Sequence, residues 1–359
     1  MKLQAVSSEY ETAAHGAKGT RFGDSEDNGR MDTFRALVAR KEGDATEVAI
    51  EDWTPEQLMP GEVTIRVEYS SINYKDGLAT RVDGGVARTY PLVIGIDLAG
   101  EVVESTDAAH KPGARVIAHG HDIGVAHHGG LSQLARIPAT WVVPLPAGLT
   151  TRQAMALGTA GFTAGMSVAA LEHMDVTPDK GPVLVTGASG GVGSTAVAML
   201  AHKGYTVAAG TGSPHAADYL KQLGASDIVD RATTTADSSR PLESGRWAGG
   251  VEAVGGPSLA YLLRTTKVGG CIAISGNVGG AAVSTTVYPF ILRGVSVLGI
   301  DSANLPLDKR TALWQRLATD LRPPQLEDSI VSEIGLDDTP AALAAILQGQ
   351  TRGRVVVRL

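Results

Sequence analysis

A glycine-rich turn at residues 187–193 offers the clearest chemistry in this sequence. Gly187, Gly190 and Gly193 follow the apolar run 183–186 and precede a stretch rich in Ala, Val and Leu. Glycines here let a strand bend sharply into a helix and let the backbone approach a pyrophosphate, which the helix N-terminus then binds. Two residues separate the first two glycines, so the pattern is a relative of G-x-G-x-x-G, and its strand–turn–helix context favours a dinucleotide site. A glycine-rich turn of another α/β protein is the alternative.

The cofactor type depends on the end of the next expected strand, 205–209. The loop 210–214 that follows carries no Asp or Glu, the residue types that usually bind the ribose hydroxyls of NAD. An acidic side chain would repel a 2′-phosphate, and its absence admits one. Thr211 and Ser213 offer hydroxyls on either side of Gly212. We therefore expect NADPH, with plain turn residues as the competing interpretation.

The glycine turn requires a domain that alternates strands with helices. Such alternation predicts a parallel sheet with right-handed crossovers, that is, an α/β Rossmann domain with a doubly wound sheet. Strands are expected at 183–186, 205–209, 227–229, 251–254, 271–275 and 295–300, and helices at 194–203 and 216–223.

The segment before residue 146 has a different pattern of apolar and polar residues. Stretches such as 62–69 and 99–104 alternate apolar and polar residues between turn signals, which predicts a small β-rich, barrel-like domain. Further helices are expected at 151–174, broken at 158–161, and at 307–320 and 339–347, with a final strand at 353–359.

Composition limits the function classes. The 359 residues suit two domains, and 43% hydrophobic residues support packed cores. The net charge of −7 argues against nucleic acid as a partner. One cysteine, Cys271, excludes an internal disulfide and fits a reducing, cytoplasmic compartment; we expect it to be a small core residue. We find no apolar run long enough to span a membrane. Residues 1–30 are polar and aperiodic, so we expect a disordered extension, and a start at Met31 would leave a complete globular chain.

Several separated stretches together resemble one protein family. The motifs are SSINYKD at 70–76, GIDLAG at 95–100, GTAGFT at 158–163, GASGGVG at 187–193, RPLE at 240–243 with WAG at 247–249, PFILRG at 289–294 and GIDS at 299–302. Their order and spacing resemble the zinc-free quinone-oxidoreductase branch of the medium-chain dehydrogenase/reductase superfamily, and within it the NADPH-dependent acryloyl-CoA reductases.

The resemblance implies a domain organisation and a partner. A GroES-like catalytic domain would span residues 31–155 and be completed by 303–359. A Rossmann NADPH-binding domain would span 156–302. Members usually pair through edge strands of their nucleotide domains, so the resemblance implies a homodimer that covers the edge strand expected at 295–300.

The resemblance also implies a reaction and its residues. A hydride would pass from NADPH to the β-carbon of an activated alkene, and a proton to the α-carbon. Tyr74 is the first candidate, as cofactor contact, proton donor or both, with a packing role as the alternative. Asn73 and Asp76 are expected to hold the turn more than to react. Lys75 would meet a CoA phosphate or remain solvated.

The cofactor-binding residues are assigned more broadly, and each single residue outside the glycine turn could equally be structural. The turn from Ser189 to Val192 should line the pyrophosphate, and the loop from Thr211 to Ser213 the adenosine phosphate. By resemblance, other positions lie near the adenine, the nicotinamide or the shared interface. The full set is Tyr74, Thr159, Gly187, Ser189, Gly190, Gly191, Val192, Gly193, Thr211, Gly212, Ser213, Arg231, Asn277, Ile291, Ser302 and Arg354.

A metal site is not expected. Zinc members of the superfamily need cysteine ligands that this chain lacks. A histidine-rich stretch with Asp122 could suggest a metal cluster, but it corresponds to a glycine-rich loop that binds no metal in the resembled branch. It also departs from that branch, where a tryptophan and an acidic residue are common, which puts the substrate details in doubt. The histidines are His119, His121, His127 and His128.

The sequence leaves three possible functions. The first is reduction of acryloyl-CoA or a similar short enoyl-CoA. The second is reduction of a quinone or enone without CoA. The third is a non-catalytic NADPH-binding redox sensor, which Tyr74 and the intact glycine turn disfavour. In the first two cases the partner is a small-molecule substrate, with no nucleic acid and no membrane.

Overall fold

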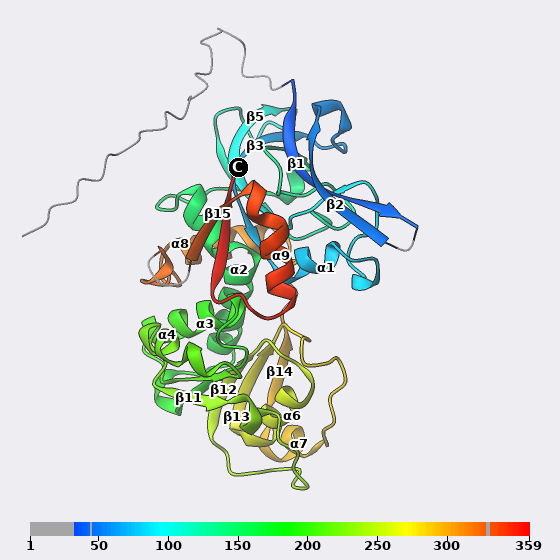
Figure 1. Ribbon diagram of the computed structural model, residues 1–359. Helices are drawn as coiled ribbons and strands as arrows, with labels where there is room; N and C mark the ends of the chain where they lie inside the picture. The colour runs from blue at the N-terminus through cyan, green and yellow to red at the C-terminus, as the bar shows by residue number, and fades with distance from the viewer. Residues whose placement is uncertain (1–31, 44, 328–330) are drawn as a thin grey trace, which may run out of the picture. The chain divides into compact units, whose positions relative to one another are not determined.

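The computed structural model describes residues 32–43, 45–327 and 331–359. The expected N-terminal extension, 1–30, and the alternative start at Met31 lie outside the described residues. The described chain contains a β-rich region and a region built on a parallel sheet (Figure 1).

The β-rich region contains two sheets. Its strands are β1 (Phe34–Glu42), β2 (Ala45–Trp53), β3 (Val63–Ile72), β4 (Leu92–Val93), β5 (Asp97–Ser105), β6 (Arg115–His119), β7 (Leu134–Ile137), β8 (Val142–Pro144), β15 (Val331–Gly335) and β16 (Arg354–Arg358). The larger sheet has the order β15-β16-β3-β5-β6-β8, with β7 also paired to β3, and the smaller one has the order β2-β1-β4. Alternate residues of β3, among them Val63, Ile65 and Val67, are buried in its core.

The last strand of the chain lies inside the larger sheet. β16 pairs antiparallel with β3 and parallel with β15. Two helices of this region also lie side by side: α1 (Tyr74–Ala79), which directly follows β3, and α9 (Thr339–Leu347), which precedes β16 (Figure 1). Sequence-distant segments thus meet where β3 ends.

The second region is a doubly wound parallel sheet. Its six strands are β9 (Val183–Val185), β10 (Val207–Thr211), β11 (Asp227–Asp230), β12 (Trp247–Glu252), β13 (Thr266–Ile274) and β14 (Ser296–Gly299), in the order β11-β10-β9-β12-β13-β14. The helices are α3 (Gly191–His202), α4 (Ala217–Gln222), α5 (Arg231–Thr234), α6 (Gly256–Thr265) and α7 (Tyr288–Arg293). Val183 and Val185 pack in one core and Leu184 in another, so both faces of the sheet are covered. The fold expected from the sequence is confirmed.

A long helix links the two regions. α2 (Thr151–His173) is kinked at Gly158, whose φ of 52° suits glycine, as the expected break at 158–161 requires. By length and composition α2 could cross a membrane, so the expectation that no apolar run is long enough was wrong. However, 78% of its apolar window is buried inside the protein. α2 packs against α3, against the parallel sheet and against α8 (Leu307–Ala318).

One strand lies earlier than expected. β12 ends at Glu252, whereas the sequence predicts a strand over 251–254. The Glu252 carboxylate accepts the backbone N–H groups of Val254 and Gly255, at 3.1 and 2.6 Å, and so turns the chain out of the strand.

Candidate functional site

A cavity of about 740 Å³ brings most of the predicted site residues together. It lies at the carboxyl ends of the parallel strands and is lined by both regions, as open α/β sheets place their ligands. Asp76, Ser213, Asn277 and Ile291 do not line it. The predicted residues that do are Asn73, Tyr74, Thr159, Gly187, Ser189, Gly190, Gly191, Val192, Gly193, Thr211, Gly212, Arg231, Ser302 and Arg354.

The glycine turn connects β9 to α3 through close backbone contacts. Gly187 has a φ of 58°, in the left-handed region that favours glycine. A Cβ on Gly193 would lie 2.3 Å from the carbonyl oxygen of Gly187, so helix and turn are in backbone contact. α3 begins at Gly191, and its first N–H groups are those that would face an anion. The geometry fits a pyrophosphate.

Hydroxyl groups at the end of β10 lie beside the side chain of Arg231, the first residue of α5. Thr211 Oγ1 accepts the N–H of Ser213 at 3.1 Å and contacts Ser189 Oγ at 3.4 Å. Arg231 lies flat against the next residue, because a Cβ on Gly212 would be 2.2 Å from its Nε. The guanidinium forms no hydrogen bond or ion pair with the part of the chain that the structure describes. A free guanidinium beside a hydroxyl is suited to a phosphate group.

Tyr74 opens α1 at the wall of the cavity. Its side chain is 40% exposed, and its hydroxyl has no hydrogen-bond partner among residues 32–43, 45–327 and 331–359. Asp76 is fully buried and accepts the N–H groups of Asn73 and Ile96, both at 2.8 Å. Burial, and next the charge of Asp97, raises the pKa of the Asp76 carboxyl to about 7. Asp76 thus holds the turn that presents Tyr74.

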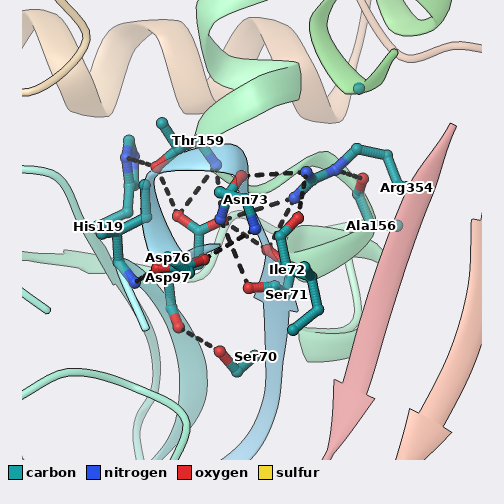
Figure 2. A network of polar contacts seen from close by, with 12 residues as sticks. Ser70, Ser71, Ile72, Asn73, Asp76, Asp97, His119, Ala156, Thr159 and Arg354 are labelled. Carbon is teal, nitrogen blue, oxygen red and sulfur yellow. Dashed lines mark hydrogen bonds and ion pairs between the residues drawn. The ribbon is translucent and has the colours of Figure 1, made fainter. Parts of the chain in front are cut away.

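A buried carboxylate ties this turn to α2 (Figure 2). The Asp97 carboxylate accepts hydrogen bonds from Ser71 Oγ at 2.5 Å, Asn73 Nδ2 at 2.7 Å and Thr159 N at 3.0 Å. The guanidinium of Arg354 lies 3.5 Å away, and neither charged side chain is more than 2% exposed. This ion pair fixes Asn73, which precedes Tyr74, relative to Thr159 in the cavity wall.

Arg354 is saturated by protein acceptors. It donates to the carbonyl oxygens of Ala156 and Ile72, each at 3.2 Å, to Asn73 Oδ1 at 3.1 Å and to Ser71 Oγ at 2.7 Å (Figure 2). Burial lowers the pKa of the guanidinium, which the charge of Asp97 opposes. Arg354 therefore lines the cavity as part of its frame, and contact with a cofactor stays a prediction.

Arg310 is a second buried cation, and it joins the two regions through His119, which contacts Thr159. Trp314 Nε1 donates to Nε2 of His119 at 3.0 Å, so in the neutral ring the proton sits on Nδ1, 3.3 Å from Thr159 Oγ1. Burial, and then the charge of Arg310, holds the pKa of His119 well below its usual value. Arg310 donates to the carbonyl oxygens of His119 at 3.0 Å and Ser302 at 3.1 Å. It thus connects the end of β6 to the segment after β14.

Among the described residues, several potential metal ligands are buried or engaged with other groups. In the described ranges, no group of three or more His, Cys, Asp and Glu side chains is placed to hold a metal ion. Cys271 is buried in β13, where burial raises the pKa of its thiol to about 11. His119 Nε2 is taken by the indole of Trp314, and both ring nitrogens of His127 contact carbonyl oxygens at 3.1 Å.

Sequence reasoning missed part of this site. Asp97 belongs to the motif at 95–100, but no role was predicted for it, and Arg310 belongs to none of the motifs. The signal for Asp97 was a charged residue within the otherwise apolar stretch 92–100, which is rarely tolerated without a buried partner. Arg310 lies on an amphipathic helix, where an arginine normally indicates the exposed face, and so gave no signal.

Family models match most of the globular chain. Residues 59–147 match the alcohol dehydrogenase GroES-like domain, and residues 191–319 match the zinc-binding dehydrogenase family. The acrylyl-CoA reductase AcuI of Ruegeria pomeroyi is 52% identical over 90% of this chain and 98% of its own. YhfP of Bacillus subtilis, named as a quinone oxidoreductase, is 50% identical over 91% of this chain and 99% of its own.

Solved structures show the same similarity. The yhdH oxidoreductase from Salmonella enterica in complex with NADP superposes with a TM-score of 0.88 at 44% identity, covering 90% of this chain and 99% of that one. Bacillus subtilis yhfP with NAD bound gives a TM-score of 0.89 at 50% identity, covering 91% and 99%. Both nicotinamide dinucleotides therefore occur in similar proteins.

Proposed function

Because the chain belongs to the medium-chain dehydrogenase/reductase superfamily, we propose that it is an NADPH-dependent oxidoreductase that reduces the activated C=C bond of acryloyl-CoA or a similar short enoyl-CoA. The observation that carries the proposal is one cavity that holds Tyr74, the glycine turn and the unpaired Arg231. The named activity of the AcuI relative supports the substrate class, and the NADP complex of a similar protein supports the cofactor.

The chain supplies binding, orientation and a proton. NADPH, when bound, supplies a hydride for the β-carbon of the alkene and is oxidised, while the C=C bond becomes a C–C bond. α3 and the glycine turn bind the pyrophosphate at backbone N–H groups. The Tyr74 hydroxyl, free of protein partners, donates the proton that the α-carbon takes up. The buried pair of Asp97 and Arg354 keeps the turn before Tyr74 in place.

Arg231 is proposed to select NADPH over NADH through the 2′-phosphate. Arg231→Ala removes a charged donor, worth about 1.5–3 kcal/mol, so the KM for NADPH should rise about 10- to 100-fold. The KM for NADH should stay unchanged because NADH lacks the phosphate. Steady-state kinetics with both cofactors measure the effect, and Arg240→Ala, an exposed arginine outside the cavity, is the control. An equal rise for both cofactors would show that Arg231 contacts the adenine or ribose instead.

The function is tested by oxidation of NADPH in the presence of acryloyl-CoA or a simple quinone, with NADH as a comparison. Turnover with acryloyl-CoA and NADPH is the expected result. Turnover with the quinone alone would favour the second candidate, quinone or enone reduction, which the name of the YhfP relative supports. Cofactor binding without turnover on any acceptor would favour a redox sensor.

A second copy of the chain is the proposed protein partner. β14 is the last strand of the parallel sheet, so its outer edge is unpaired within the described part of the chain. Beside it, α7 and the residue before it expose Val287, Ile291 and Leu292, which are 60%, 68% and 62% exposed. Pairing of two β14 edges would cover these side chains, and it would explain why Ile291, assigned to the cofactor or shared interface, lies outside the cavity.

Leu292→Asp should convert the dimer to a monomer, because it introduces a charge into the proposed apolar contact. Light scattering after size-exclusion chromatography measures the mass. Val82→Asp, at an apolar position of the β-rich region that is 39% exposed, should leave the dimer intact. A wild-type monomer at micromolar concentration would refute the proposal.

The remaining assignments also stay proposals. The domain boundaries are residues 31–155 with 303–359, and 156–302. We propose that catalysis needs no zinc, which metal analysis of the purified protein tests, since stoichiometric zinc would contradict it. A cytoplasmic location, supported by the single buried cysteine, is tested by cell fractionation.

A further inference from the structure

Six aliphatic side chains from the β-rich region line part of the cavity. This aliphatic pouch consists of Ile72, Ile96, Ile123, Val125, Ile346 and Leu347. Ile72, Ile96 and Val125 are buried in one core cluster, against which Ile346 packs. Ile72 is separated from Tyr74 by a single residue, so the pouch adjoins the proposed proton donor. An apolar pouch at this place favours an alkyl group over a polar one.

The fixed wall of the pouch is held by backbone contacts. The N–H of Ile96 donates to Asp76 Oδ1 at 2.8 Å. Gly124 separates Ile123 from Val125, and a Cβ there would lie 2.7 Å from the carbonyl carbon of Gly95. The loop that carries these two side chains thus touches the end of the opposing segment, backbone to backbone. The wall cannot shift without breaking that contact.

The last turn of α9 forms a second wall of the pouch, the α9 wall. A Cβ on Gly77 of α1 would lie 2.9 Å from Leu347 Cγ and 3.2 Å from Ile346 Cγ2. α1 begins at Tyr74, so this close helix contact fixes the distance between Tyr74 and the α9 wall. Ile346 and Leu347 are half-buried, whereas Ile72, Ile96, Ile123 and Val125 are buried, so the α9 wall is where extra length could be admitted.

We propose that the aliphatic pouch holds the alkyl substituent on the β-carbon of the alkene, and that Ile346 sets the chain length accepted. This inference rests on the proposed function. A β-carbon without a substituent, as in acryloyl-CoA, leaves the pouch available, and each added methylene must find space against Ile346. The site discriminates by volume alone, because none of the six residues carries a polar side chain.

Ile346→Ala should therefore shift the preference toward longer substrates. The measured quantity is kcat/KM for the β-propyl homologue of acryloyl-CoA divided by kcat/KM for acryloyl-CoA. Since misfit of even one methylene changes kcat/KM by roughly 10- to 200-fold in an apolar pocket, the ratio should rise at least about 10-fold. Ile346→Phe fills the space and should lower the ratio.

The matched control is Ile334→Ala. Ile334 lies in β15 and packs against the same core cluster but does not line the cavity, so the same atoms are lost without enlarging the pouch. Its ratio should equal that of the wild type. The same comparison is run with methyl vinyl ketone and its β-propyl homologue, which carry the alkene without CoA.

The outcomes test the role of the pouch separately from the proposed function. Reduction of both thioesters with an unchanged ratio in Ile346→Ala refutes the pouch and leaves the function standing. Reduction of the ketones alone refutes the CoA substrate, while the ketone ratio still decides for or against the pouch. A wild-type protein that reduces neither series refutes both.

Discussion

Asp97→Ala should lower the free energy of unfolding by about 3–5 kcal/mol, because it leaves the Arg354 charge buried without its counter-ion. The carboxylate is fully buried and accepts hydrogen bonds from three other residues, so their donors lose a partner as well. Urea unfolding of the variant and the wild type measures the difference. The expected loss is large because Asp97 and most of the side chains around it are buried, so water cannot readily replace the lost acceptor.

The double variant with Arg354→Met tests this cause. Removing both charges avoids the unpaired ion, so the double variant should lose less stability than the sum of the two single variants. Additive losses would mean that the ion pair contributes nothing beyond packing. A loss under about 1 kcal/mol for Asp97→Ala, the range of an exposed ion pair, would contradict the burial described above.

Tyr74→Phe should reduce kcat with acryloyl-CoA by about 100-fold or more, because a positioned acid contributes roughly that much to a proton-transfer step. The ring is kept, so the KM for NADPH should change little. Steady-state kinetics in water and in deuterium oxide measure the effect, and a solvent isotope effect on kcat should grow if proton delivery becomes limiting.

Tyr69→Phe is the matched control for the lost hydroxyl. Tyr69 lies in β3, five residues before Tyr74, and does not line the cavity. Its variant should keep the wild-type rate. Unchanged turnover in Tyr74→Phe would remove the hydroxyl from the mechanism and leave Tyr74 as a wall of the cavity.

Local pattern was sufficient for the parallel sheet and the glycine turn. The run 183–186 and the glycines after it encode strand and turn within a few residues, and α9 lies where the sequence predicts a helix, over 339–347. The boundary of β12 could not be predicted, because it depends on the Glu252 carboxylate binding two backbone N–H groups beyond the strand.

The polar frame of the site needed the three-dimensional structure. Ser71, Asp97, Thr159 and Arg354 come from four separate parts of the chain, and no spacing in the sequence relates them. The placement of Arg231 likewise depends on the tertiary structure, because its position against Gly212 follows from the pairing of β10 with β11. Such placements follow from strand order rather than from local residue preference.

The position of β16 inside the larger sheet sets an order of assembly during translation. All strands of the parallel sheet lie between residues 183 and 299, so that sheet can close before residues 354–358 are synthesised. β3 gains β16 as a neighbour, and Asp97 gains Arg354, only after residues 354–358 have been synthesised. The nascent protein thus acquires its dinucleotide half first, and the half that carries Tyr74 is completed later.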